Sequence, residues 1–146
     1  MPTRTIAQII EGRTLITVSG DTNVRAACCL MAEKNIGALL VVEGGRIAGI
    51  FTERDALKKV LAAKLDPDAS AVAQVMVADP QTIRGDKPLG HALYMMAEGG
   101  YRHVPVVNES GAPIGMVSSR DALGQDMIDL ERDLRLKEQL EESIGY

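Results

Sequence analysis

Aromatic side chains are scarce in this sequence. Only four of its 146 residues are aromatic, namely Phe51, Tyr94, Tyr101 and Tyr146, so a core must be built from aliphatic, alanine and methionine side chains. The same scarcity removes the stacking platforms on which single-stranded nucleic acids are bound. The 16 basic and 20 acidic side chains give a net charge of −4, and no run of lysine and arginine is present to bind a phosphate backbone. We therefore expect no nucleic-acid partner.

Long apolar runs are missing as well. The longest uninterrupted runs, residues 26–32 and 36–42, have seven residues each, whereas a helix needs about 20 to cross a bilayer. Arg4 is followed by a broken pattern and not by the apolar block of a signal peptide. We expect a cytoplasmic protein with no membrane partner.

Groups that carry catalysis or bind metals are few. The two cysteines, Cys28 and Cys29, are adjacent, and neighbours on a helix point about 100° apart, which disfavours a bridge between them. Core packing is the expected role of Cys28, whereas Cys29 is expected off the buried face. The only histidines are His91 and His103, without a nucleophile motif, metal-ligand spacing or phosphate loop. We expect that the protein is not an enzyme and that it has no metal site and no required cofactor.

The sequence does contain an internal repeat. Residues 17–42 align with residues 82–107 at a shift of 65, and residues 49–57 align with residues 115–123 at a shift of 66. Fourteen of these 35 aligned pairs are identical. Such self-similarity indicates two copies of one structural unit.

Each copy is predicted to fold as a β-α-β-β-α unit preceded by a short helix near Ile6 or Val72. Hydrophobic periodicity and turn residues place the strands at 15–18, 38–42 and 46–51, and in the second copy at 82–83, 104–107 and 113–117. The second helix of each copy is expected to begin at Glu53 or Ser119. The first helices carry matching apolar stripes, formed by Val24, Ala27, Cys28 and Met31 in one copy and Leu89, Ala92, Leu93 and Met96 in the other.

These patterns divide the chain into residues 5–64, residues 70–125 and a charged helical tail at residues 126–146. A linker at residues 64–70 separates the copies. Toward the tail, one apolar stripe gives way to a different face; the stripe is Leu123, Met127, Leu130 and Leu134, and the other face is Leu136, Leu140 and Ile144. A helix of this kind either packs on its own domain or meets a partner subunit.

A short motif follows the hairpin of each copy, with the pattern Gly-apolar-apolar-Thr/Ser-x-x-Asp at residues 49–55 and 115–121. A Thr or Ser three residues before an acid is typical of a capping box, which satisfies free N–H groups at the start of a helix. A helix N-terminus also attracts phosphate, and the arginine in each motif can pair with phosphate oxygens. The two roles are compatible.

With these motifs the sequence resembles the tandem cystathionine β-synthase (CBS) domains, a pair also called a Bateman module. The resemblance rests on residues 35–42, on the two motifs above and on residues 101–107. Because it covers nearly the whole chain apart from the tail, we expect a stand-alone CBS domain-containing protein. It implies an α+β fold in which two CBS units pack sheet to sheet with pseudo-two-fold symmetry, followed by a C-terminal helical extension.

The resemblance also implies two clefts, each built crosswise from both copies, that bind adenine nucleotides or related adenosyl ligands. The first cleft would use Thr52, Arg54, Asp55, Pro80, Gln81, Thr82, Tyr101, Arg102 and His103. The second cleft would use Thr14, Leu15, Ile16, Ile36, Gly37, Ala38, Ser118, Arg120 and Asp121. The two aspartates would accept hydrogen bonds from ribose hydroxyls, the Thr and Ser hydroxyls would meet phosphate, and the apolar strand starts would enclose the base.

The two implied clefts differ in charge. Arg102 and His103 belong to the first cleft, at the positions that Ile36 and Gly37 occupy in the second. We therefore expect a phosphorylated ligand to prefer the first cleft. AMP, ADP or ATP rank first as the ligand, ahead of NAD(H) and S-adenosylmethionine.

The leading hypothesis is a regulatory binding module. Its ligand would shift the packing of the two units, or of a homodimer, and so change contact with an unidentified regulated protein. The alternative is a structural homodimerisation module with vestigial clefts that bind no ligand.

Overall fold

Two small mixed sheets form the centre of the protein. The computed structural model describes residues 4–145, apart from the side chains of residues 125–128. In the first sheet, β1 (Thr17–Val18) runs parallel to β2 (Ala38–Glu43), which pairs antiparallel with β3 (Arg46–Thr52). A short strand that the sequence analysis did not predict, β4 (Val77–Ala78), adds to the edge of β3.

The second sheet repeats the arrangement of the first three strands. It contains β5 (Ile83–Arg84), β6 (His103–Val107) and β7 (Pro113–Ser118), with the first pair parallel and the second antiparallel. Even the irregularities match, because the register shifts between Val41 and Val42 in one sheet and at the equivalent valines in the other. The predicted α+β fold with two repeated units is therefore confirmed.

The first helix of each unit packs through the stripe that its sequence predicts. These helices are α2 (Val24–Lys34) and α5 (Leu89–Gly99). Each ends at a left-handed residue, Asn35 with φ 54° or Gly100 with φ 73°, which turns the chain toward the next strand. Cys28 is half-buried against the core and Cys29 is exposed, as expected. The buried stripe residues are Val24, Ala27, Met31, Leu89, Ala92 and Met96.

The short helices that precede the two units are exchanged between them. The first, α1 (Ile6–Ile10), buries its isoleucines in the core of the second unit, together with Ile83 and Val104. The second, α4 (Val72–Val75), is buried in the core of the first unit. The sequence-based segments 5–64 and 70–125 therefore follow the chain, whereas the packing crosses between them.

A glycine in each unit makes this exchange possible. The Ala7 N–H donates to the Gly85 carbonyl at 2.8 Å, and the Ala73 N–H donates to the Gly20 carbonyl at 3.0 Å. A Cβ on Gly85 would lie 3.3 Å from the Ala7 Cβ, and one on Gly20 would lie 3.2 Å from the Ala73 Cβ. Each pair of backbones can approach this closely because a glycine stands there.

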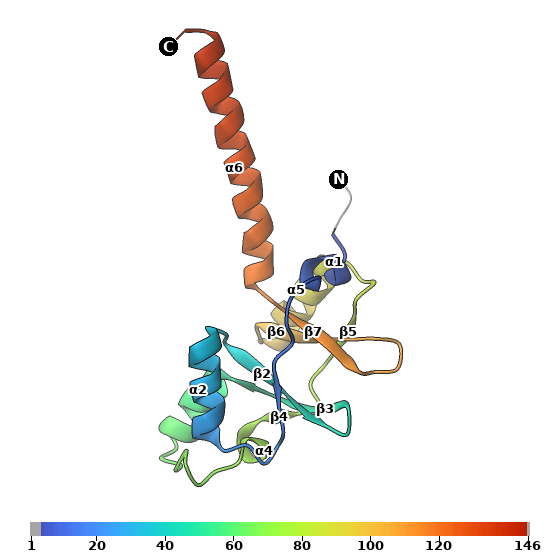
Figure 1. Cartoon of the computed structure of the whole chain (residues 1–146), viewed down its shortest axis with the longest axis vertical. Helices are drawn as coiled ribbons and strands as arrows, with labels where there is room; N and C mark the ends of the chain where they lie inside the picture. Colours follow the sequence, from blue (N-terminus) through green and yellow to red (C-terminus); the bar gives the residue numbers. More distant parts are fainter. Residues whose placement is uncertain (1–3, 146) are drawn as a thin grey trace.

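The two sheets pack against each other through small aliphatic side chains. Leu40 and Ile50 are buried in a cluster that also contains Leu15 and, from β7 of the second unit, Met116. Figure 1 shows the two sheets facing each other across the middle of the molecule, with α2 and α5 on their outer sides. This interface between the units is where the predicted site residues are expected to meet.

The second helices of the two units differ in length and form. In the first unit, the short α3 (Glu53–Asp55) continues directly into a π-helix, η1 (Ala56–Leu61). In the second unit, α6 (Arg120–Ser143) is one helix of 24 residues that includes nearly all of the predicted tail. It projects away from the body of the protein (Figure 1).

Candidate functional site

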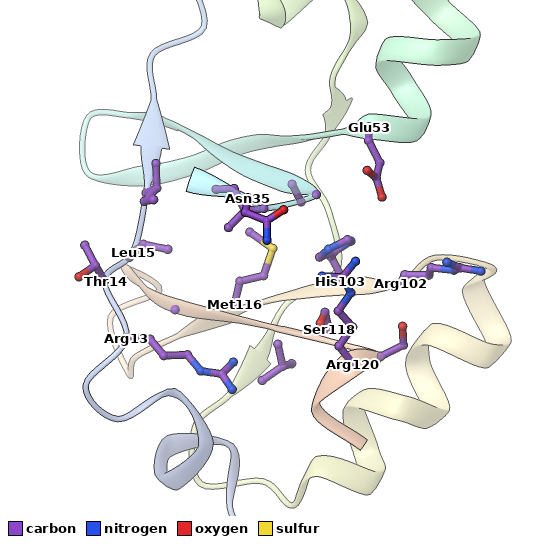
Figure 2. Close-up of a pocket in the computed structure, with 17 residues that line it drawn as sticks. Arg13, Thr14, Leu15, Asn35, Glu53, Arg102, His103, Met116, Ser118 and Arg120 are labelled. Atoms are coloured by element: carbon purple, nitrogen blue, oxygen red, sulfur yellow. The ribbon is translucent and has the colours of Figure 1, made fainter. Parts of the chain in front are cut away.

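A cavity of about 340 Å³ opens between the two units. This volume lies at the lower end of the range for small-molecule sites. Its walls come from the segment before β1, the start of β2, the start of β6 and the turn from β7 into α6 (Figure 2). The lining residues are Arg13, Thr14, Leu15, Ile16, Asn35, Ile36, Gly37, Ala38, Glu53, Arg102, His103, Gly115, Met116, Val117, Ser118, Ser119 and Arg120.

Strand pairing brings the polar residues of the second unit together. His103 at the start of β6 is in register with Ser118 at the end of β7. One residue outward on each strand, the Ser119 N–H donates to the Arg102 carbonyl at 3.0 Å. Arg102 and His103 therefore lie beside the Ser-x-x-Asp motif of their own unit.

The corresponding residues of the first unit, at the start of β2 and the end of β3, lie close to His103. The Glu53 N–H donates to the Gly37 carbonyl at 3.0 Å. A Cβ on Gly37 would lie 3.1 Å from Glu53 Oε1 and 3.6 Å from His103 Cε1. Because the units are related by pseudo-two-fold symmetry, the starts of β2 and β6 meet near the axis, where their residues can serve either cleft.

The cavity has an excess of positive charge. Its lining includes Arg13, Arg102 and Arg120, with Glu53 as the one carboxylate. Among the described residues, Arg102 and Arg120 form no ion pair. Burial lowers the pKa of His103 below its ordinary value, and the nearby Arg120 and Arg102 lower it further, while Glu53 opposes the shift.

Asp121 connects the cavity wall to the start of α6. Its carboxylate is 9% exposed and accepts from the Ser118 N–H at 2.8 Å, as in half of a capping box. Its other oxygen accepts from Arg13 Nη2 at 2.6 Å. Arg13 precedes β1, 108 positions earlier in the chain, so this ion pair ties the N-terminal segment to α6.

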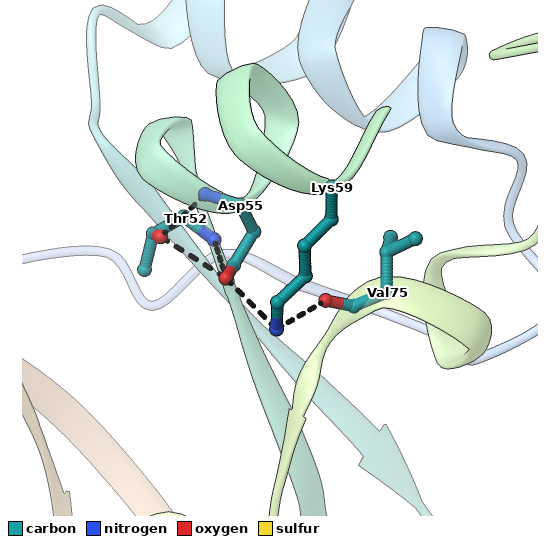
Figure 3. Close-up of polar contacts among 4 residues, drawn as sticks. All are labelled: Thr52, Asp55, Lys59 and Val75. Atoms are coloured by element: carbon teal, nitrogen blue, oxygen red, sulfur yellow. Dashed lines mark hydrogen bonds and ion pairs between the residues drawn. The ribbon is translucent and has the colours of Figure 1, made fainter. Parts of the chain in front are cut away.

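The equivalent motif of the first unit forms a complete capping box. The Asp55 N–H donates to Thr52 Oγ1 at 3.2 Å, and the Thr52 N–H donates to Asp55 Oδ2 at 3.0 Å. Lys59 Nζ lies 3.2 Å from Asp55 Oδ1 and donates to the Val75 carbonyl at 3.0 Å (Figure 3). The donors at Asp55 therefore come from the first unit's own second helix and its capping residue.

Several of the other residues predicted for the first cleft have hydrogen-bond partners outside this cavity. Arg54 Nη1 donates to the Gly100 carbonyl at 3.2 Å, and Tyr101 OH donates to Gln81 Oε1 at 2.7 Å. Pro80 and Thr82 line a separate hollow, whose other lining residues are Arg46, Ile47, Asp79, Val107 and Gly111.

The cavity thus brings together most of the residues predicted for the second cleft and some of those predicted for the first. Eight of the nine residues predicted for the second cleft line it; the ninth, Asp121, lies behind its wall. Arg102 and His103, which sequence reasoning grouped with the first cleft, also line it. The β6–β7 pairing holds these two side chains beside Ser118, and the expected charge difference between the clefts stays a prediction.

Sequence reasoning missed several lining residues. Arg13 and Asn35 directly precede predicted site segments, so widening those segments by one residue would have included them. Met116 and Ser119 lie inside the motif that was quoted. Glu53 lies at the equivalent position of the first copy's motif, but only the packing of the two units brings it to this cavity.

No helix in the described part of the chain is both long enough and apolar enough to cross a membrane. Across residues 4–145, leaving aside the side chains at 125–128, no three His, Cys, Asp or Glu side chains are grouped as a metal site would require.

The family model for the CBS domain matches the chain twice, at residues 7–62 and 72–126. The chain belongs to the CBS domain family. A CBS domain-containing protein from Arabidopsis thaliana is 32% identical over 120 residues, which are 82% of this chain and 22% of the relative. The meiotically up-regulated gene 70 protein of Schizosaccharomyces pombe is 41% identical over 101 residues, which are 69% of this chain and 14% of the relative. The chain thus spans less than a quarter of the length of these two proteins.

Solved structures with CBS domains share the fold. A CBS-domain protein from Burkholderia ambifaria superimposes with a TM-score of 0.80 at 38% identity, covering 86% of this chain and 95% of the other. A CBS domain protein from Pyrobaculum aerophilum, solved with AMP, has a TM-score of 0.74 at 24% identity and covers 80% of this chain and 88% of its own. The CBS domain pair of protein MJ0100, solved with 5-methylthioadenosine and S-adenosyl-L-methionine, has a TM-score of 0.77 at 24% identity and covers 88% and 99%.

Proposed function

We propose that this CBS pair is a regulatory module that binds an adenine nucleotide in the cavity between its two units. The observation that carries the proposal is the pair Arg102 and Arg120, which line the cavity without an ion-pair partner among the described residues. Guanidinium groups bind phosphate oxygens through paired hydrogen bonds. An anionic ligand would therefore supply an ion-pair partner for these two side chains.

The cavity also offers an apolar region for a base. Leu15, Ile36 and Met116 are half-buried lining residues, and Figure 2 shows Leu15 at the opposite end of the cavity from Arg102 and Arg120. A ligand with a flat apolar end and an anionic end would match this division. The Ser118 hydroxyl and Arg120 would meet the phosphate.

The charge of the cavity ranks the adenosyl ligands. With Arg13 paired to Asp121, Arg102 and Arg120 against one glutamate favour AMP, ADP or ATP, whereas S-adenosylmethionine carries a positive sulfonium that these two arginines would repel. Two proteins of the same fold were solved with adenosine-containing ligands, which supports testing this class first. The preference for the first cleft is replaced by a preference for this cavity.

Ligand binding can regulate because the cavity has walls from both units. A ligand that bridges β2 of one unit and the β7–α6 turn of the other would favour one packing of the units over another. The consequence would be a change in contact with a regulated protein or between two copies of the chain.

Thermal unfolding in the presence of candidate ligands tests the function. A ligand that binds only the native state raises the melting temperature with concentration. We expect AMP and ATP to raise it and S-adenosylmethionine to raise it less at equal concentration. No shift with AMP, ATP, NAD or S-adenosylmethionine would favour the structural alternative, a dimerisation module with vestigial clefts.

A further inference from the structure

The far part of α6 exposes large apolar side chains. Every residue from Leu130 to Gly145 is exposed. Single helices of this length are marginal in water unless a face is packed, and contiguous exposed apolar side chains mark interaction sites. The exposed fractions are 60% for Leu123, 52% for Leu130, 52% for Leu134, 53% for Leu136, 65% for Leu140 and 65% for Ile144.

These side chains lie on two faces of the helix. Leu123, Leu130 and Leu134 are spaced seven and four residues apart, which returns them to one side; we call this the leucine stripe. Leu136 and Leu140 are rotated away from that stripe by about a quarter to two fifths of a turn. The two faces can therefore be changed independently.

Acidic residues flank the leucine stripe. Glu131 and Glu138 lie along one edge. Asp133 lies along the other edge, where Lys137 stands closer to the stripe, and Glu141 continues the line of the stripe, so that acidic side chains outnumber basic ones around it. Glu131 also accepts from Arg135 at 2.6 Å, four residues on and farther from the stripe. In residues 120–143 there are eight acidic and four basic side chains, a net charge of −4, so the other residues of the chain sum to zero.

This charge pattern disfavours pairing of the leucine stripe with a second copy of itself. In a parallel pair of helices, Glu138 of one copy would face Asp133 of the other across the seam. In an antiparallel pair with Leu130 opposite Leu134, Glu131 would face Glu131, and Asp133 would face Asp133. Like charges meet in both arrangements and oppose association.

We infer that the leucine stripe of α6 is a docking surface for an amphipathic helix of another protein, one that carries a leucine-type stripe flanked by lysine or arginine. Such a partner buries the exposed leucines and pairs with the acidic edges. Because α6 begins at Arg120, which lines the cavity, one helix carries both a part of the cavity wall and the docking surface. The inference itself does not depend on the identity of the ligand.

Binding of designed helical peptides to the full chain tests this inference. The probe is an 18-residue peptide with leucines spaced three and four apart and with lysine and arginine on both flanks; the comparison peptide keeps the leucines and carries glutamate on the flanks. Fluorescence anisotropy measures both affinities. We expect the basic peptide to bind at least tenfold more tightly than the acidic one.

Two double variants distinguish the stripe from general charge attraction. Leu130→Gln with Leu134→Gln is expected to weaken binding of the basic peptide at least tenfold. Leu136→Gln with Leu140→Gln, on the other face, is expected to change it less than threefold. Circular dichroism and the melting temperature establish that both variants are folded.

Three outcomes would overturn the inference. The first is an equal effect of the two double variants: equal loss would mean that the leucine stripe matters no more than the other face, and no loss in either would indicate attraction by charge alone. The second is a dimer in light scattering that Leu130→Gln with Leu134→Gln dissociates, which would make a second copy the occupant. The third is the absence of any binding by the basic peptide. Titration of the same variants with AMP reports on the cavity, so that a failure of peptide docking can be told apart from a failure of nucleotide binding.

Discussion

The ion pair between Arg13 and Asp121 shows how single residues set the properties of the cavity. Asp121 is buried and has two donors, the Ser118 N–H and the Arg13 guanidinium. A ribose hydroxyl that approached Asp121 would have to share or replace the Arg13 contact. Asp121 therefore has a structural role that a sequence motif alone does not distinguish from ligand binding.

Removing Arg13 is expected to destabilise the protein. Arg13→Ala leaves a buried carboxylate with one of its two donors, which costs about 1–2 kcal/mol in the free energy of unfolding. The control is Arg25→Ala, because Arg25 pairs with Asp68 where both side chains are more than half exposed, and such pairs contribute at most about 0.5–1 kcal/mol. Urea denaturation measures both. A smaller loss for Arg13→Ala than for Arg25→Ala would contradict the buried role of Asp121.

The elements themselves follow from the sequence more readily than their partners do. Hydrophobic stripes predicted α2 and α5, and turn residues predicted the hairpins, because these features depend on neighbours a few positions apart. The exchange of α1 and α4 between the units depends on contacts between residues far apart in the chain, such as Ala7 with Gly85 and Ala73 with Gly20. Their short apolar patterns do not specify which core receives them.

The exchange of α1 and α4 between the units can be tested with two matched substitutions, one in each helix. Ile6→Ala removes a fully buried side chain from the core of the second unit, at a cost of about 2–4 kcal/mol. Hydrogen exchange is expected to accelerate most in α5 and β6, although the substitution lies in the first ten residues.

The matched variant is Val72→Ala, which opens the core of the first unit. In this variant, hydrogen exchange is expected to accelerate most in α2 and β2. If each substitution instead accelerated exchange in the unit that follows the substituted residue in the chain, the crosswise packing would be wrong.

At the scale of the whole molecule, the pseudo-symmetry holds for the backbone of the hairpins and is broken in their side-chain contacts. The register shifts of the hairpins coincide after alignment. The ion-pair partners of the two motif aspartates differ, because Asp55 pairs with Lys59 of its own unit and Asp121 pairs with Arg13. One interface thereby acquires a basic cavity while the residues of the other predicted cleft are engaged elsewhere.

This asymmetry explains what the sequence could predict about the site. The repeat and its motifs located most of the second cleft, because those residues lie at strand and helix ends that the repeat defines. The assignment of Arg102 and His103 to one cleft could not be made in this way. Both residues lie near the pseudo-two-fold axis, where only three-dimensional packing decides which cavity they line.

Calorimetric titration with AMP, carried out on matched arginine variants, tests the central claim most directly. Arg120 and Arg54 occupy equivalent positions in the two copies, but only Arg120 lines the described cavity. We expect Arg120→Ala to weaken AMP binding at least tenfold and Arg54→Ala to change it less than threefold. Equal effects of the two substitutions, or a larger effect of Arg54→Ala, would contradict the assignment of the nucleotide to this cavity.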